Sequence, residues 1–387
     1  MTDKKTVYLD YAAATPLDER VFVAMKPFFS DNFYNPSSPY LAAKRVKTAL
    51  REAKETIGRV IGAKESEIIL TAGATESVNM AIWGTLNHFE GGHVVTTAIE
   101  HPAVLQAIKR HPYTIVPVQQ NGLVDSSAIK AAITDETVLI TVGLVNNELG
   151  AVQPLREIAQ LVAVQRQQRL QRDIGLPLLL HSDASQAAGL LDINTARLGV
   201  DLLTLNAAKC YGPKQTGLLW VKSGVQLSPL IVGGGQEGNL RSGTQSVPNA
   251  VGFAVALEHA DARRKHYSEE LRRLRDYLQE IVTKSIPETI VNGPIKRRAP
   301  NFLHLAWPNV DAERVLFSLD ERGIMVATGS ACAANKGTRS HVLTAIGMAP
   351  EIADGSIRIT LGKYTTKEEI EYAARTIIEV VQKELQR

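Results

Sequence analysis

A lysine and an aspartate stand at the ends of two apolar runs within the stretch from His181 to Lys214. Asp183 closes the run LPLLLHSD, Lys209 follows the run DLLTLNAA, and a helix-length segment separates them. An amine that holds an aldehyde as a Schiff base, and a carboxylate that keeps a pyridine nitrogen protonated, are what pyridoxal phosphate (PLP) requires. Gln186, in the same loop as Asp183, is placed to hydrogen-bond the ring hydroxyl. The pattern therefore predicts a PLP site.

Each residue also has an ordinary structural explanation. Asp183 could cap a helix that starts near Ser185, and Lys209 could be a solvated lysine in a loop. The placement of both residues at strand ends favours the cofactor site.

Other polar residues follow predicted strands in the same way. Apolar runs alternate with helix-length segments, and several runs are continuous, as is typical of parallel strands buried on both faces. Ligands bind at the carboxyl edge of such sheets. We therefore expect one site to be built from the loops that contain Thr71–Ser77, Glu100 and His101, Asn146–Glu148, Asp183–Gln186, and Ala208 and Lys209.

The motifs AGATES, HSDASQAAG, NAAKCYGPK and GSAC occur in this order along the chain. Together they are similar to those of the NifS/IscS-type cysteine desulfurases, and the resemblance covers nearly the whole chain. It implies an α/β protein of the aspartate-aminotransferase-like fold (PLP fold type I). A large PLP-binding domain with a mainly parallel seven-stranded sheet is expected over residues 15–255. A smaller α+β domain that carries the cysteine loop is expected to comprise residues 1–14 and 256–387.

Local patterns predict several elements. An extended opening precedes a turn at 35–38, and a helical pattern over residues 41–61 ends at Gly62. The pattern from Pro248 to about Ile286 predicts one long helix that leads out of the large domain. The final helix begins with a capping box, Thr366 to Glu369.

The resemblance assigns roles around the cofactor. Ala74 and Thr75 lie in a glycine-containing turn that enters a helix, where backbone N–H groups favour a phosphate. His101 is implied to stack over the pyridine ring as an acid or base, and Asn147 to lie near the ring hydroxyl and the substrate. Thr244, in a glycine-rich loop, is implied to reach the PLP phosphate of a second subunit, which predicts a homodimer. From the residues alone, a helix cap, a structural histidine, a turn asparagine and a surface loop remain alternatives.

Two further residues are implied to act on the substrate. Arg358 lies in the apolar pattern SIRIT and needs an anionic partner, which the resemblance identifies as the carboxylate of the substrate. A structural ion pair is the alternative. Cys332 stands among small residues, which favours a reactive thiol, with Lys336 and Arg339 available to stabilise the thiolate. The resemblance makes Cys332 the persulfide-forming nucleophile, whereas Cys210 is taken as a bystander.

The segment before Lys209 departs from the family pattern. Relatives usually carry Ser-x-His there, whereas this chain has Asn206, Ala207 and Ala208. Asn206 can still donate a hydrogen bond to the phosphate, but Ala208 cannot. One missing charge-assisted contact is worth about 1.5–3 kcal/mol, so we expect weaker PLP retention.

Composition limits the remaining functions. The chain of 387 residues has a formal net charge of +3, which points to neither a nucleic-acid nor a membrane partner. Its opening lacks the apolar core of a signal peptide, and no run approaches the ~20 apolar residues of a membrane span, so a cytoplasmic protein is expected. Two cysteines are too few for a disulfide framework or a cysteine-held metal cluster, and no metal is expected.

These observations predict an enzyme that converts L-cysteine to L-alanine and a persulfide on Cys332. The sulfur would pass to an iron–sulfur scaffold or a tRNA-thiolation enzyme. A selenocysteine lyase, or another PLP lyase or aminotransferase of the same fold, is the nearest alternative. A non-catalytic sulfur-relay adaptor, suggested by Ala208, is the alternative from a different class.

Overall fold

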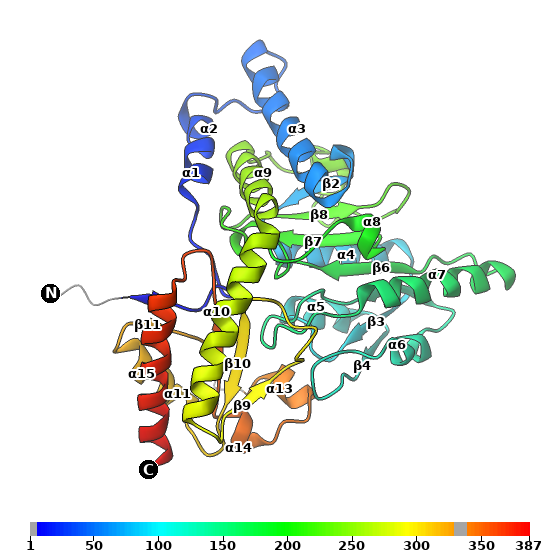
Figure 1. Ribbon diagram of the computed structural model, residues 1–387. Helices are drawn as coiled ribbons and strands as arrows, with labels where there is room; N and C mark the ends of the chain where they lie inside the picture. The colour runs from blue at the N-terminus through cyan, green and yellow to red at the C-terminus, as the bar shows by residue number, and fades with distance from the viewer. Residues whose placement is uncertain (1–5, 329–338) are drawn as a thin grey trace.

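The computed structural model describes residues 6–328 and 339–387, and its largest element is a seven-stranded sheet (Figure 1). β8 runs antiparallel to both of its neighbours, and the other adjacent pairs are parallel. The predicted mainly parallel seven-stranded sheet is therefore confirmed. In spatial order the strands are β2 (Ile68–Thr71), β8 (Gly217–Val221), β7 (Leu202–Asn206), β6 (Leu179–Asp183), β5 (Thr137–Thr141), β3 (His93–Thr97) and β4 (Tyr113–Val116).

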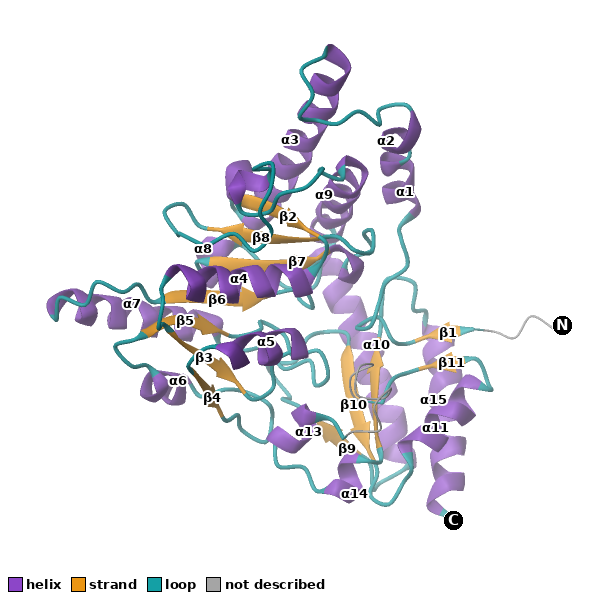
Figure 2. Cartoon of the chain, turned by 180° about the vertical axis from the view of Figure 1, so that it is seen from behind, coloured by secondary structure: helices purple, strands orange, loops and turns teal. Residues whose placement is uncertain are grey.

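Helices bury both faces of this sheet (Figure 2). Successive residues of β8 illustrate the arrangement, because Leu218 and Trp220 belong to one apolar core and Leu219 and Val221 to the other. This double burial explains the continuous apolar runs in the sequence. One core includes α3 (Leu41–Ile61), α7 (Leu155–Gln171) and α9 (Val247–Ala262), and the other includes α4 (Ala74–His88) and α5 (Pro102–Ala107). Two short helices, α6 (Ser126–Ala132) and α8 (Thr195–Leu198), lie in the connections.

A second sheet, with strand order β12-β10-β9, is antiparallel. A separate apolar core joins Val7 and Leu9 to side chains between Leu271 and Val381. Residues near both ends of the described chain thus share one core, while the predicted domain boundaries at residues 14 and 255 stay a prediction. The elements of this part are β1 (Val7–Tyr8), α10 (Arg264–Ser285), β9 (Ile290–Asn292), β10 (Phe302–Ala306), α11 (Ala312–Asp320), β11 (Ile324–Met325), α13 (His341–Ala345), α14 (Pro350–Ala353), β12 (Ser356–Thr360) and α15 (Lys367–Leu385).

The local signals of α3 and α15 are confirmed. Gly62 ends α3 in the left-handed conformation, with φ of 73°. Thr366 and Glu369 form the predicted capping box of α15 through reciprocal hydrogen bonds.

The predicted single helix from Pro248 to Ile286 is wrong, because Arg263 separates α9 from α10 with φ of −108° and ψ of 2°. The reason is packing, since α9 buries residues in the core of the large sheet and α10 buries Leu271, Leu278 and others in the second core. The prediction of an extended segment before the turn at 35–38 is only partly correct, because this segment contains α1 (Glu19–Met25) and α2 (Pro27–Ser30).

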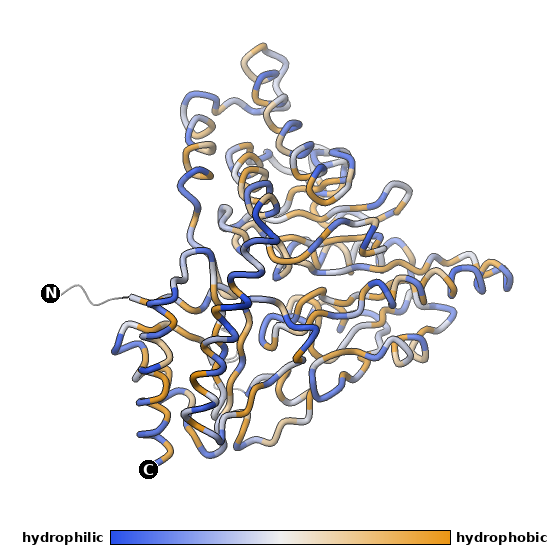
Figure 3. The backbone as a smooth tube through the Cα atoms, in the orientation of Figure 1, coloured by the Kyte–Doolittle hydropathy of each residue, from blue (hydrophilic) through white to orange (hydrophobic). Residues whose placement is uncertain are grey.

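Hydropathy follows this arrangement. Figure 3 shows hydrophobic segments concentrated in the strands and alternating with hydrophilic ones along the covering helices. Within the described ranges, no helix combines the length and the apolar character needed to cross a membrane.

Candidate active site

A cavity of about 240 Å³ lies at the carboxyl edge of the parallel strands. Its wall combines the start of α4, the loops after β3, β5, β6 and β7, the N-terminal residues Ala12 and Ala13, and one residue of β12. Most residues predicted from the sequence to bind cofactor or substrate line this cavity: Ala74, Thr75, His101, Asn147, Asp183, Gln186, Asn206, Lys209 and Arg358.

Lys209 ends a short 3₁₀ turn that follows β7. The side chain of Asn206 shapes this turn, because its Oδ1 accepts a hydrogen bond of 3.1 Å from the backbone N–H of Ala208. The ammonium group of Lys209 donates to the backbone carbonyls of Ala12, at 2.7 Å, and Ala13, at 2.6 Å. These two bonds hold the ammonium group at the edge of the cavity, against the N-terminal segment of residues 9–18, which we call the strap.

Asp183 is the last residue of β6, and its Oδ1 accepts a hydrogen bond of 2.9 Å from Ser185 N. The helix that the sequence offered near Ser185 is absent, because residues 185–190 form turns, and the carboxylate lines the cavity. Gln186 also contacts the strap, because its Nε2 donates to the carbonyl of Ala12 at 3.0 Å.

His101 stands on the cavity wall at the start of α5. Its Nδ1 accepts a hydrogen bond of 3.1 Å from Ala103 N. Burial by the surrounding protein lowers the pKa of His101, the charge of Asp183 offsets part of this shift, and the charge of Lys209 adds to it. The imidazole is therefore neutral at neutral pH, and the bond at Nδ1 leaves its proton on Nε2.

The start of α4 has the geometry of an anion site. The first backbone N–H groups of a helix have no partner inside the helix, and those of Ala74 and Thr75 stand at the cavity wall. Gly73 precedes them with φ of 139°, a conformation that glycine alone adopts readily. Gly217 of β8 allows this close approach, because a Cβ there would lie 2.6 Å from the carbonyl carbon of Gly73.

Two buried acids brace the loops around the cavity. Glu100 accepts hydrogen bonds from Thr97 Oγ1 at 2.7 Å and Gly143 N at 2.9 Å, and burial raises its pKa to about 7. Glu148 accepts a hydrogen bond of 2.5 Å from the hydroxyl of Ser340, which caps α13, and burial raises its pKa as well. Sequence reasoning placed both acids at strand ends but gave them no role.

Arg358 is only 2% exposed and already has a protein anion beside it. Its NH2 donates to Asp10 Oδ1 at 2.6 Å, and its NH1 donates to the carbonyl of Asn147 at 2.9 Å. Sequence analysis missed Asp10, although it ends the apolar run VYL just as Asp183 ends its own run.

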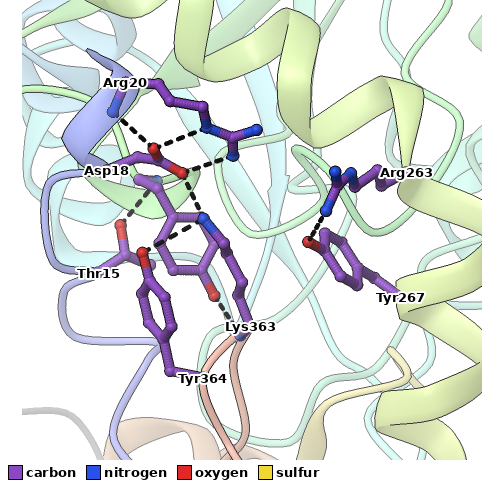
Figure 4. Close-up of polar contacts among 8 residues, drawn as sticks. Thr15, Asp18, Arg20, Arg263, Tyr267, Lys363 and Tyr364 are labelled. Atoms are coloured by element: carbon purple, nitrogen blue, oxygen red, sulfur yellow. Dashed lines mark hydrogen bonds and ion pairs between the residues drawn. The ribbon is translucent and has the colours of Figure 1, made fainter. Parts of the chain in front are cut away.

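A second polar cluster lies at the far end of the strap (Figure 4). Asp18 accepts hydrogen bonds from Arg20 Nε at 3.1 Å and NH2 at 2.9 Å, and it also pairs with Lys363. These partners, Arg20 first, lower the pKa of Asp18 despite its burial. Tyr211, two residues after Lys209, accepts a hydrogen bond of 2.6 Å from the backbone N–H of Lys363. The strap thus joins the Lys209 turn to the loop after β12.

Other predicted residues lie elsewhere. Thr244 is exposed and does not line the cavity. Cys332 and Lys336 lie outside the described residues. Arg339 forms two hydrogen bonds of 2.7 Å with Asp354, and its expected action on the thiolate stays a prediction. Cys210 is buried, which raises its pKa to about 12 and leaves the thiol unreactive.

The cavity fits PLP at three points. The N–H groups at the start of α4 suit its phosphate, Asp183 suits the pyridine nitrogen, and Lys209 suits the aldehyde.

Comparisons with known proteins agree with this geometry. Residues 7–373 match the family model described as aminotransferase class-V. The chain is 41% identical over 387 residues to "Cysteine desulfurase IscS" of Dictyoglomus turgidum, covering 98% of this chain and 95% of that protein. Two solved structures are also similar. "NifS-like protein" has a TM-score of 0.89 and 32% identity, covering 98% of this chain and all of the other (100%). "SspA in complex with cysteine" has a TM-score of 0.78 and 35% identity, and the match covers 93% of this chain and 100% of the other.

Proposed function

This chain belongs to the class-V aminotransferase family, and from that premise we propose that it is a PLP-dependent cysteine desulfurase. It converts L-cysteine to L-alanine and leaves the sulfur as a persulfide on Cys332. The observation that carries the proposal is that Lys209, Asp183 and Arg358, from three separate strands or turns, line one cavity.

Different residues of the cavity would bind different groups of PLP. Lys209 holds the aldehyde, Asp183 the pyridine nitrogen, and the start of α4, with Asn206, the phosphate. When bound, PLP supplies an electron sink that stabilises negative charge on the α-carbon of the substrate.

Three side chains then handle the substrate. Arg358 binds its carboxylate, which fixes the α-carbon relative to Lys209. The amine of Lys209 accepts the α-proton, and the carbonyls of Ala12 and Ala13 stabilise the ammonium that results. His101 is neutral and held at Nδ1, so Nε2 is the atom that moves a proton.

Sulfur transfer requires a second thiol. The thiolate of Cys332 attacks the sulfur of the substrate, a new S–S bond forms, and the bond between Cβ and sulfur breaks with its electron pair left on carbon. Protonation of that carbon gives alanine, so cysteine and one enzyme thiol become alanine and one enzyme persulfide. The persulfide then passes to an acceptor protein, for which we propose an iron–sulfur scaffold or a tRNA-thiolation enzyme.

We propose that the enzyme is a homodimer in which Thr244 reaches the PLP phosphate of the partner subunit. Exposed apolar side chains support this proposal, because Phe29 and Phe33, near α2, are 61% and 65% exposed, and Val232, in the loop that leads to Thr244, is 78% exposed. Large apolar groups of this kind are typical of surfaces that another chain covers.

A cytoplasmic location is also proposed. The chain has two cysteines, one buried and one assigned here to carry sulfur. A persulfide-forming thiol must stay reduced between turnovers, which the cytoplasm ensures.

The test is alanine formation from L-cysteine by the PLP-loaded protein with a thiol reductant. We expect alanine and sulfide in equal amounts, and loss of both in Cys332→Ala. Wild-type protein that binds PLP but forms no alanine would reject the proposal.

A further inference from the structure

Arg358 and Asp10 form the most enclosed ion pair at the cavity, with side chains 3% and 17% exposed. Arg358 lines the cavity and Asp10 does not, so the carboxylate contacts the guanidinium from outside the cavity. The backbone on both sides of Asp10 is fixed to Thr360 of β12. The carbonyl of Leu9 accepts a hydrogen bond of 2.8 Å from Thr360 N, and Thr360 Oγ1 accepts one of 2.9 Å from Ala12 N.

The guanidinium carries five N–H donors, and two of them have partners among the described residues. NH2 donates to Asp10 and NH1 to the carbonyl of Asn147. Within the described chain, the buried Nε of Arg358 has no hydrogen-bond partner. A substrate carboxylate that binds this arginine therefore becomes the second anion on one guanidinium.

We propose that Asp10 is a positioning residue that competes with the substrate's carboxylate for Arg358. The inference rests on the proposed function, in which Arg358 binds that carboxylate. In the absence of substrate, Asp10 keeps the buried guanidinium paired and oriented, since an unpaired buried charge is costly. In its presence, the two carboxylates repel each other across the shared cation.

This competition acts on substrate and product alike, because L-cysteine and L-alanine carry the same carboxylate. Uniform weakening of binding raises KM without lowering kcat, and it speeds the departure of alanine. Asp10 thus limits inhibition of the enzyme by bound L-alanine.

The strap offers a matched control. Asp18 is another strap carboxylate, and it pairs with Lys363, which follows Arg358 in the same segment. Asp18 does not line the cavity of Arg358. Asp18→Asn therefore loosens the strap without changing the charge beside Arg358.

The experiment measures binding of L-alanine and of L-alaninamide to the PLP-loaded enzyme, followed by the visible absorbance of PLP. Alaninamide keeps the amine and lacks the carboxylate charge. We expect Asp10→Asn to bind L-alanine about tenfold more tightly, equivalent to about 1.4 kcal/mol, with alaninamide affinity unchanged. Its KM for L-cysteine should fall without an increase in kcat. Asp10→Glu, which keeps the charge, and Asp18→Asn should not tighten alanine binding.

The outcomes separate the two proposals. Unchanged or weaker alanine binding by Asp10→Asn, or equal tightening of both ligands, would overturn the role of Asp10 while leaving the proposed function intact. A wild-type enzyme that does not prefer alanine over alaninamide would reject Arg358 as the carboxylate site and the role of Asp10 with it, while the proposed function is decided by alanine formation from L-cysteine. If Asp10→Asn does not fold, Asp10→Ser gives the same comparison.

Discussion

Glu100 shows how much one carboxyl group can depend on its surroundings. Burial, and to a smaller extent the charge of Asp183, raise its pKa to about 7, although Thr97 and Gly143 donate hydrogen bonds to it. Between the ordinary pKa of about 4.5 and about 7, the folded protein holds a proton that the unfolded chain has lost. The free energy of unfolding must therefore decrease as the pH rises through this window.

Glu100→Gln removes this ionisation and keeps the shape of the side chain. Relative to wild type, we expect the variant to gain stability between about pH 4.5 and about pH 7, by up to about 3 kcal/mol. Urea unfolding at both ends of the window measures the difference. Parallel pH profiles for the two proteins would show that Glu100 stays ionised in the fold.

Ala208 is the other residue at which one side chain should have a large effect. Restoring the family's histidine by Ala208→His adds a possible charge-assisted contact to the PLP phosphate. We expect PLP affinity to rise about tenfold, which corresponds to about 1.4 kcal/mol, and Ala208→Leu to give no increase. The titration is made by adding PLP to the cofactor-free protein, and equal affinities for wild type and Ala208→His would contradict the expectation.

At the scale of elements, the contact between β8 and the start of α4 determines the shape of the phosphate end. A methyl group at position 217 would overlap the backbone of Gly73 and the carbonyl of Leu205, at 2.6–2.9 Å. We expect Gly217→Ala to cost about 1–3 kcal/mol of stability and about tenfold in PLP affinity. Thermal unfolding and PLP titration measure these effects.

Gly175 provides the control for this substitution. A Cβ there meets no atom within 4 Å, so Gly175→Ala should change neither quantity. Equal PLP affinity for the two variants would mean that the turn at Gly73 does not shape the phosphate site.

Elements that the sequence predicts well are those with a local cause. The strands from Ile68 to Val221 are continuous apolar runs, and Gly62 marks the end of α3. The break at Arg263 has no glycine or proline to mark it, because it arises from two cores that form only in the folded protein. Asp10 escaped notice for the same reason: its partner Arg358 lies 348 residues away. Burial of Glu148 by α13 likewise has no local signature.

At the scale of the whole molecule, the proposed dimer makes each active site a joint product of two chains. In that proposed dimer, Lys209 would come from one subunit and Thr244 from the other. Mixed dimers of Lys209→Ala and Thr244→Ala should therefore contain one intact site. After unfolding and refolding together, about a quarter of all sites should be intact if pairing is random.

The measurement is desulfuration by the refolded mixture, compared with each variant refolded alone. Lys209→Ala alone should be inactive, and Thr244→Ala alone should bind PLP weakly. A mixture no more active than the average of its components would contradict a shared site, and a monomeric protein in sedimentation would contradict the dimer itself.

The strap has a consequence for the order in which the protein matures. Its residues are synthesised long before their partners, because β1 pairs with β11 and Asp10 pairs with Arg358, 348 residues later in the sequence. Domains form as their residues emerge during synthesis, so the large sheet can assemble before Arg358, the partner of Asp10, has been made. The cavity therefore gains Arg358 only after the segments that carry Asp183 and Lys209 have been synthesised.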